Sequence, residues 1–95
     1  MLFRSNNPFV TEQAEGLARR LVGASSVPRQ RIELAHQLAW SRPAKSIEVD
    51  RGIGYLEEYR NQLVKAGVSG DKLELESWTS YARIMLSANE FVYLD

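Results

Sequence analysis

Apolar side chains recur at intervals of three and four residues along four stretches of the chain, the spacing of one face of an α-helix. The four apolar faces consist of Val10, Ala14, Leu17, Ala18 and Leu21; Ile32, Ala35, Leu38 and Ala39; Val49, Ile53, Leu56 and Leu63; and Leu75, Trp78, Ala82 and Met85. No two segments carry the pattern of a β-hairpin. The sequence therefore predicts an all-α fold, a compact bundle of four helices whose sequence neighbours run roughly antiparallel.

Residues that favour helix ends bound the first two stretches. Asn7 is a good N-cap, and Pro8 fits the first helical position because its missing N–H would have no partner there. Gly23 is a natural end for this helix. The second helix is expected to begin at residues 26–27 and to end before Pro43, since the residue before proline is driven out of the α-helical region.

The third and fourth helices are bounded in the same way. Ser46 is the expected N-cap of the third helix, and Gly67 is its expected end. The fourth helix follows a turn at residues 68–70 and is expected to end at Asn89. Residues 90–95 are too apolar to stay in water, so we expect them to form a short C-terminal tail that packs back on the bundle.

Two glycines, Gly52 and Gly54, interrupt the third helix. Glycine in a helix interior costs about 1 kcal/mol relative to alanine. These residues therefore either weaken the helix or allow another element to pack closely against it.

Composition narrows the possible functions. The 95 residues suit a single domain, and 12 basic and 12 acidic side chains give a formal net charge of zero, so no general attraction to nucleic acid or membrane is expected. With no cysteine, the chain has no disulfide, thiolate metal site or covalent haem, and we expect no cofactor. We see neither a signal peptide nor a membrane-spanning run of about 18 apolar residues.

The single histidine suggests one weak metal-site hypothesis. Glu33 and His36 have the Glu-x-x-His spacing that carboxylate-bridged di-iron bundles use. Such a site needs two of these pairs and two further glutamates, so one chain cannot complete it. The alternative is an exposed or locally hydrogen-bonded histidine. If metal or redox chemistry is involved, the chain would be an accessory part of such an enzyme.

Residues 34–47 are similar to the first helix and turn of a helix-turn-helix motif, which raises DNA binding as an alternative. A basic cluster lies around the first loop, formed by Arg19, Arg20, Arg29 and Arg31. The following helix, however, carries several carboxylates that would face phosphates and weaken binding. A solvated arginine cluster on a packed helix pair is the competing interpretation, and we expect no nucleic-acid partner.

Three segments together resemble one known family. Asn6-Asn7-Pro8-Phe9-Val10, followed by Glu12-Gln13-Ala14, resembles the family opening N-S-P-F-V-x-E-Q-A. Leu38-Ala39-Trp40-Ser41-Arg42-Pro43 resembles L-A-L-G-R-P-P, and Ser87-Ala88-Asn89-Glu90-Phe91-Val92-Tyr93-Leu94-Asp95 resembles S-N-E-F-x-Y-V-D. The family is the planctomycete-specific domain of unknown function at the C-terminal end of large, exported, cytochrome-c-like proteins.

This resemblance implies where the chain belongs and assigns it no catalytic residue. It implies that residues 1–95 are one helical domain, the C-terminal segment of a larger exported protein located in the periplasm or at the cell surface. The chain departs from the family where Ser46-Ile47-Glu48-Val49 replaces Thr-Pro-Glu-Glu and where Ser41 replaces glycine. Both changes affect helix geometry.

Taken together, the residues and the resemblance favour a non-catalytic module for domain docking or assembly, whose partner is another domain of the parent or another protein. Arg42 and Glu90 lie at the ends of the second and fourth helices and would pair if the tail folds back. Phe91 and Tyr93 are candidate partner-binding residues, because apolar side chains in a terminal segment need a surface to cover them. The sequence does not give the oligomeric state.

Overall fold

The computed structural model describes residues 8–94, and the side chains of residues 9–88. The described part of the chain contains four helices and no strand: α1 (Pro8–Ala24), α2 (Pro28–Trp40), α3 (Ser46–Lys65) and α4 (Gly70–Leu94). The fold is a compact all-α globule, as the spacing of apolar residues predicts.

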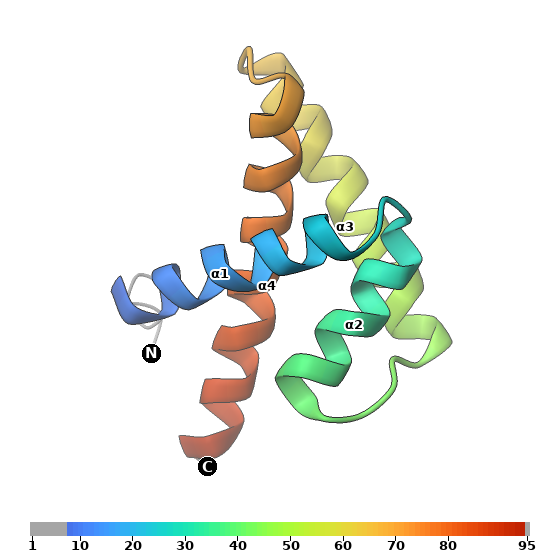
Figure 1. The fold of residues 1–95 in the computed structure, drawn as a ribbon, viewed down its shortest axis with the longest axis vertical. Helices are drawn as coiled ribbons and strands as arrows, with labels where there is room; N and C mark the ends of the chain where they lie inside the picture. The colour runs from blue at the N-terminus through green and yellow to red at the C-terminus, as the bar shows by residue number, and fades with distance from the viewer. Residues whose placement is uncertain (1–7, 95) are drawn as a thin grey trace.

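The longest helix, α4, holds the fold together by contacting each of the other three helices. Figure 1 shows α1 crossing the middle of α4 instead of running alongside it, whereas α3 and α4 form a splayed pair joined at one end. Small side chains line the crossing: Ala14 and Ala18 of α1 are fully buried, as are Ser77 and Ala82 of α4. Small residues let two helix backbones approach closely, which explains the extensive contact between helices from opposite ends of the sequence.

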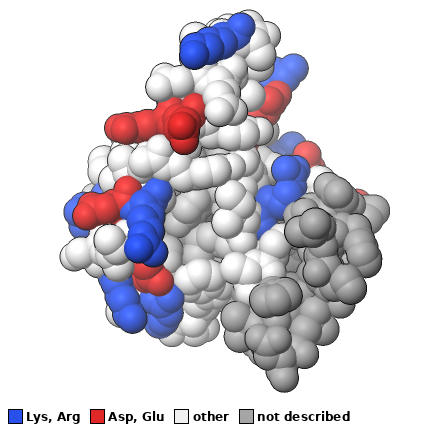
Figure 2. Space-filling view, turned by 180° about the vertical axis from the view of Figure 1, so that it is seen from behind, with Lys and Arg blue, Asp and Glu red and all other residues white. Residues whose placement is uncertain are grey.

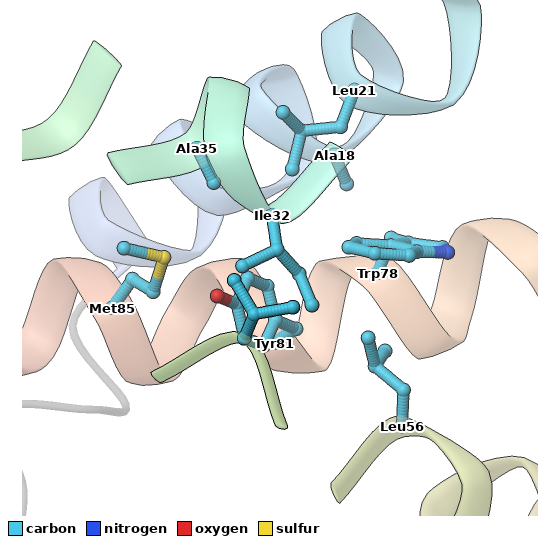
Figure 3. Packing of buried hydrophobic residues seen from close by; sticks show 9 residues of the cluster. Ala18, Leu21, Ile32, Ala35, Leu56, Trp78, Tyr81 and Met85 are labelled. Atoms are coloured by element: carbon cyan, nitrogen blue, oxygen red, sulfur yellow. The ribbon is translucent and has the colours of Figure 1, made fainter. Parts of the chain in front are cut away.

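The core lies where α1, α2 and α3 meet α4. In Figure 3, Ile32 of α2 lies in the middle of the cluster, next to Trp78 and Tyr81 of α4. Leu56 extends into the same cluster from α3. Each large apolar side chain buried in this way contributes about 1.5–3 kcal/mol. Most of the predicted apolar positions are buried, but Leu38 is partly exposed.

Three predicted helix boundaries are wrong. The first helix does not end at Gly23, because α1 continues to Ala24. The fourth helix does not end at Asn89, because α4 continues to Leu94 and leaves no separate tail in residues 90–94. Asparagine favours helix ends because its side chain can hydrogen-bond to nearby backbone groups, but this preference is weak and residues 90–94 continue the helix here. The N-cap of α3 is Lys45, not Ser46, and the Lys45 backbone N–H donates to the Glu48 carboxylate at 2.9 Å.

The two glycines of α3 have different surroundings. A Cβ atom on Gly52 would lie 2.9 Å from Ile32 Cδ1 and 3.3 Å from Tyr81 Cε1, whereas a Cβ atom on Gly54 would meet nothing within 4 Å. Gly52 therefore allows α2 and α4 to pack tightly against α3. Gly54 makes no such contribution and only weakens the helix.

Candidate functional site between α2, α3 and α4

A pocket of about 420 Å³ opens between the end of α2, the first half of α3 and the second half of α4. Its lining is mostly apolar and aromatic, and includes Trp40, Tyr55, Tyr81, Ile84 and Met85. Ile84 is 50% exposed although it is a large apolar residue. An apolar pocket with a few polar groups in its wall is the usual form of a binding site for a small molecule or a side chain.

His36 is the most deeply buried polar side chain in the pocket wall, with 3% of its surface exposed. Its Nδ1 atom lies 2.9 Å from the Ile32 carbonyl oxygen. A carbonyl oxygen only accepts hydrogen bonds, so Nδ1 carries a proton and donates it to this oxygen. The edge of the ring also meets the Trp40 ring at a centroid distance of 5.0 Å. These contacts fix the orientation of the imidazole.

The carboxylate of Glu48 lies next to this histidine but is already engaged. Arg42 donates to both of its oxygens, at 2.9 Å and 2.7 Å, and the Lys45 backbone N–H adds a third hydrogen bond. Hydrogen bonds from Arg42 and the Lys45 backbone lower the pKa of Glu48 to about 2. The group is therefore ionised at neutral pH, and its charge is balanced by a two-pronged guanidinium contact.

His36 Nε2 and Glu48 Oε1 lie 3.6 Å apart, which is too far for a hydrogen bond. Among the described residues, the buried side-chain polar atoms without a hydrogen-bond partner are Trp40 Nε1 and Ser87 Oγ, and Trp40 lines this pocket.

Tyr81 forms another part of the pocket wall. Burial, together with the nearby charge of Glu48, raises the pKa of its hydroxyl, so the phenol stays protonated at neutral pH. The Tyr55 hydroxyl is hydrogen-bonded to that of Ser80, and the Tyr55 ring stacks on Tyr59 at a centroid distance of 5.8 Å. The walls on α3 and α4 are thus held in place by contacts between the two helices.

A second charged cluster lies around Arg31, which is only 5% exposed. Its guanidinium donates to the carbonyl oxygens of Val22 and Ser25 and, at 2.9 Å, to the Glu74 carboxylate. It also lies 5.2 Å from the centre of the Trp78 ring. Arg31 thus connects the end of α1, the following loop, α2 and α4.

Glu74 also accepts a hydrogen bond from Arg60. Burial acts to raise the pKa of Glu74, but the hydrogen bond from Arg31 and the charges of the two arginines together lower it. A carboxylate shared by two guanidiniums stays ionised and joins α2, α3 and α4.

The predicted site residues lie in different environments. Glu33 is about half exposed and lies 3.9 Å from Arg29, and within residues 9–88 no three metal-ligating side chains form a group. The four-arginine cluster is not a single solvated group, because Arg31 is buried. Arg42 contacts Glu48. The side chains of Glu90, Phe91 and Tyr93 lie outside the described residues, so the Arg42–Glu90 pair remains a prediction.

The surface seen from behind carries charges of both signs. Figure 2 shows lysines and arginines interspersed with acidic side chains around an uncharged area, with no broad region of one sign on this face. This distribution agrees with the formal net charge of zero. In residues 8–94, no helix is long and apolar enough to cross a membrane.

Sequence reasoning missed Glu48 and Tyr81 as parts of the pocket. A usable signal for Glu48 was its position three residues after the N-cap, where an acidic residue accepts from the cap backbone. No comparable signal existed for Tyr81, since its aromatic ring fits a core position equally well. Comparisons with protein-family models, curated proteins and solved structures find no match for this chain.

Proposed function

We propose that the chain is a non-catalytic helical module that docks onto a protein partner, either another domain of a larger parent protein or a separate chain. The observation that carries the proposal is the apolar pocket between α2, α3 and α4, with Ile84 half-exposed at its edge. When a partner covers a large apolar residue and the concave apolar surface beside it, apolar area leaves water and the free energy of the complex falls.

The charged side chains around the pocket support a binding role. Arg42 and Glu48 balance each other, and this pair fixes one wall of the pocket. Arg31 belongs to a separate cluster, where it pairs with Glu74. An exported, cytochrome-c-like parent is part of the same proposal and depends on the resemblance of the three sequence segments described above.

The test is binding of the isotope-labelled chain to the rest of the polypeptide encoded in its reading frame, produced separately and followed by NMR. We expect chemical-shift changes at Tyr55 and Ile84. The variant Ile84→Glu should weaken binding at least about tenfold, because it places a charge at an apolar contact. The matched control is Val64→Glu, since Val64 is similarly exposed, at 56% against 50% for Ile84, but lies near the end of α3.

Three results would overturn the proposal. The first is binding that Ile84→Glu and Val64→Glu weaken equally, which would place the contact away from the pocket, while no binding at all would overturn docking within a parent polypeptide. The second is tight, salt-sensitive binding to DNA in an electrophoretic shift assay, which would favour the helix-turn-helix alternative. The third is stoichiometric iron or manganese in the purified chain, which would favour the Glu33–His36 site and an accessory role in a metal enzyme.

A further inference from the structure

We propose that the pocket between α2, α3 and α4 accepts an acidic, apolar peptide segment of the partner. In this arrangement a large apolar side chain enters the pocket, a neighbouring carboxylate pairs with Arg51, and a carbonyl oxygen of the segment accepts a hydrogen bond from Trp40 Nε1. The assignment specifies what occupies the docking site and therefore rests on the proposed function. Three features support it: the charge at the pocket, an unpaired donor in its wall, and its apolar lining.

Arg51 brings a positive charge to the pocket that no described residue balances. Arg42 and Glu48 pair with each other through two hydrogen bonds. Arg51 also lines the pocket, but it is exposed and forms no ion pair with another described residue. A carboxylate on the partner would therefore meet a free guanidinium, whereas an ammonium group would be repelled. The charge at this site thus favours an acidic segment.

Trp40 supplies an unpaired donor in the same wall. Its Nε1 atom is buried and has no hydrogen-bond partner among the described residues. An indole nitrogen only donates hydrogen bonds, so the missing partner is an acceptor. A buried donor without a partner costs free energy, which a ligand recovers by supplying an acceptor oxygen. Because Nε1 is buried, we expect the ring to turn slightly as that oxygen approaches.

The lining favours a large apolar side chain. Tyr55, Tyr81 and Met85 supply two aromatic rings and a polarisable sulfur, and Ile84 is half-exposed beside them. Such groups make favourable contacts with an apolar or aromatic side chain. The volume of about 420 Å³ falls in the range of roughly 300–1,000 Å³ that is typical of small-ligand sites. A phenylalanine next to an aspartate combines this apolar body with a carboxylate and backbone carbonyl oxygens.

The test titrates three short peptides into the isotope-labelled full chain, followed by NMR. Aspartyl-phenylalanine, asparaginyl-phenylalanine and lysyl-phenylalanine, each acetylated and amidated, differ only in the side chain next to the phenylalanine. The aspartyl peptide should bind about threefold more tightly than the asparaginyl peptide, the size of one exposed ion pair, and the lysyl peptide should bind most weakly. The indole N–H signal of Trp40 should shift, whereas that of Trp78, which lines a different pocket, should not.

Two matched variants isolate the charge. In Arg51→Gln the preference for the aspartyl over the asparaginyl peptide should fall to about onefold. Arg19→Gln should keep the full preference, because Arg19 is exposed on α1, which contributes no residue to the pocket wall. Trp40→Phe removes the indole donor, so it should weaken all three peptides by about fivefold and leave the preference unchanged.

The inference is overturned if the aspartyl peptide binds no more tightly than the other two, if its preference survives in Arg51→Gln, or if the Trp40 indole signal moves no more than that of Trp78. Should Trp40→Phe fail to fold, the Arg51 variant and the two indole signals of the unaltered chain still decide the question. Peptide binding without docking of the parent polypeptide would refute the docking function alone. Docking that Ile84→Glu weakens, without the charge preference, would refute the acidic segment alone.

Discussion

The two charged clusters use the same chemistry in different surroundings. In one, Arg31 is buried and reaches Glu74, which lies 43 positions away in the sequence. In the other, Arg42 is more exposed and reaches Glu48, only six positions away across the α2–α3 loop. The first cluster holds distant parts of the chain together, and the second fixes one loop and one wall of the pocket. Burial and sequence separation, more than the ion pair itself, determine what such a contact does for the fold.

The largest effect on stability is expected when the arginine of each cluster is replaced in turn. Arg31→Met should lower the free energy of unfolding by about 3 kcal/mol, because two carbonyl oxygens and a carboxylate lose a buried donor. Arg42→Met should have a much smaller effect, because water can replace an exposed guanidinium. Urea unfolding with an unchanged m value measures both. Equal losses for the two variants would contradict the distinction between the clusters.

A smaller effect on stability is expected at Gly52, where α3 packs closely against α2 and α4. Gly52→Ala should lower the free energy of unfolding by about 1–2 kcal/mol, because its Cβ atom would press on Ile32 and Tyr81. Gly54→Ala is the matched control and should raise stability by about 0.5–1 kcal/mol through helix propensity. Thermal melts of both variants check the prediction, and a stabilising Gly52→Ala would show that the contact is not tight.

The smallest expected effect is on the pH dependence of stability. The pKa of Glu48 in the folded chain is about 2, below its ordinary value of 4.5, and the pKa of Glu74 is also lowered. A lowered pKa contributes stability above the ordinary value that is lost as the pH falls through the folded one. The melting temperature should therefore fall as the pH drops from 4.5 towards 2.

The variant Glu48→Gln measures how much the Arg42–Glu48 cluster contributes to the pH dependence of stability. The variant should melt a few degrees lower than the unaltered chain at neutral pH, and its melting temperature should fall less on acidification. Glu74→Gln makes the same comparison for the buried cluster. If acid lowered the melting temperature of Glu48→Gln as much as that of the unaltered chain, the Arg42 contact would have no part in the acid response.

The sequence was sufficient to predict the helices, because a stripe such as Val49, Ile53 and Leu56 carries its own periodicity. It could not predict that Arg31 is buried, since arginine is usually exposed and its carboxylate partner lies on another helix. The pocket also escaped prediction, because it depends on how three helices are placed in space. The end of α4 was missed because Asn89 is compatible both with a helix end and with a helix interior.

The crossing of α1 over α4 has a consequence for synthesis of the chain. The ribosome makes α1 first and α4 last, so the small side chains Ala14 and Ala18 emerge well before the surface that covers them. Until α4 follows, the first three helices lack the element that each of them contacts. Closure of the domain therefore waits for the last segment to leave the exit tunnel, and a product cut short before residue 70 would expose its core to chaperones and proteases.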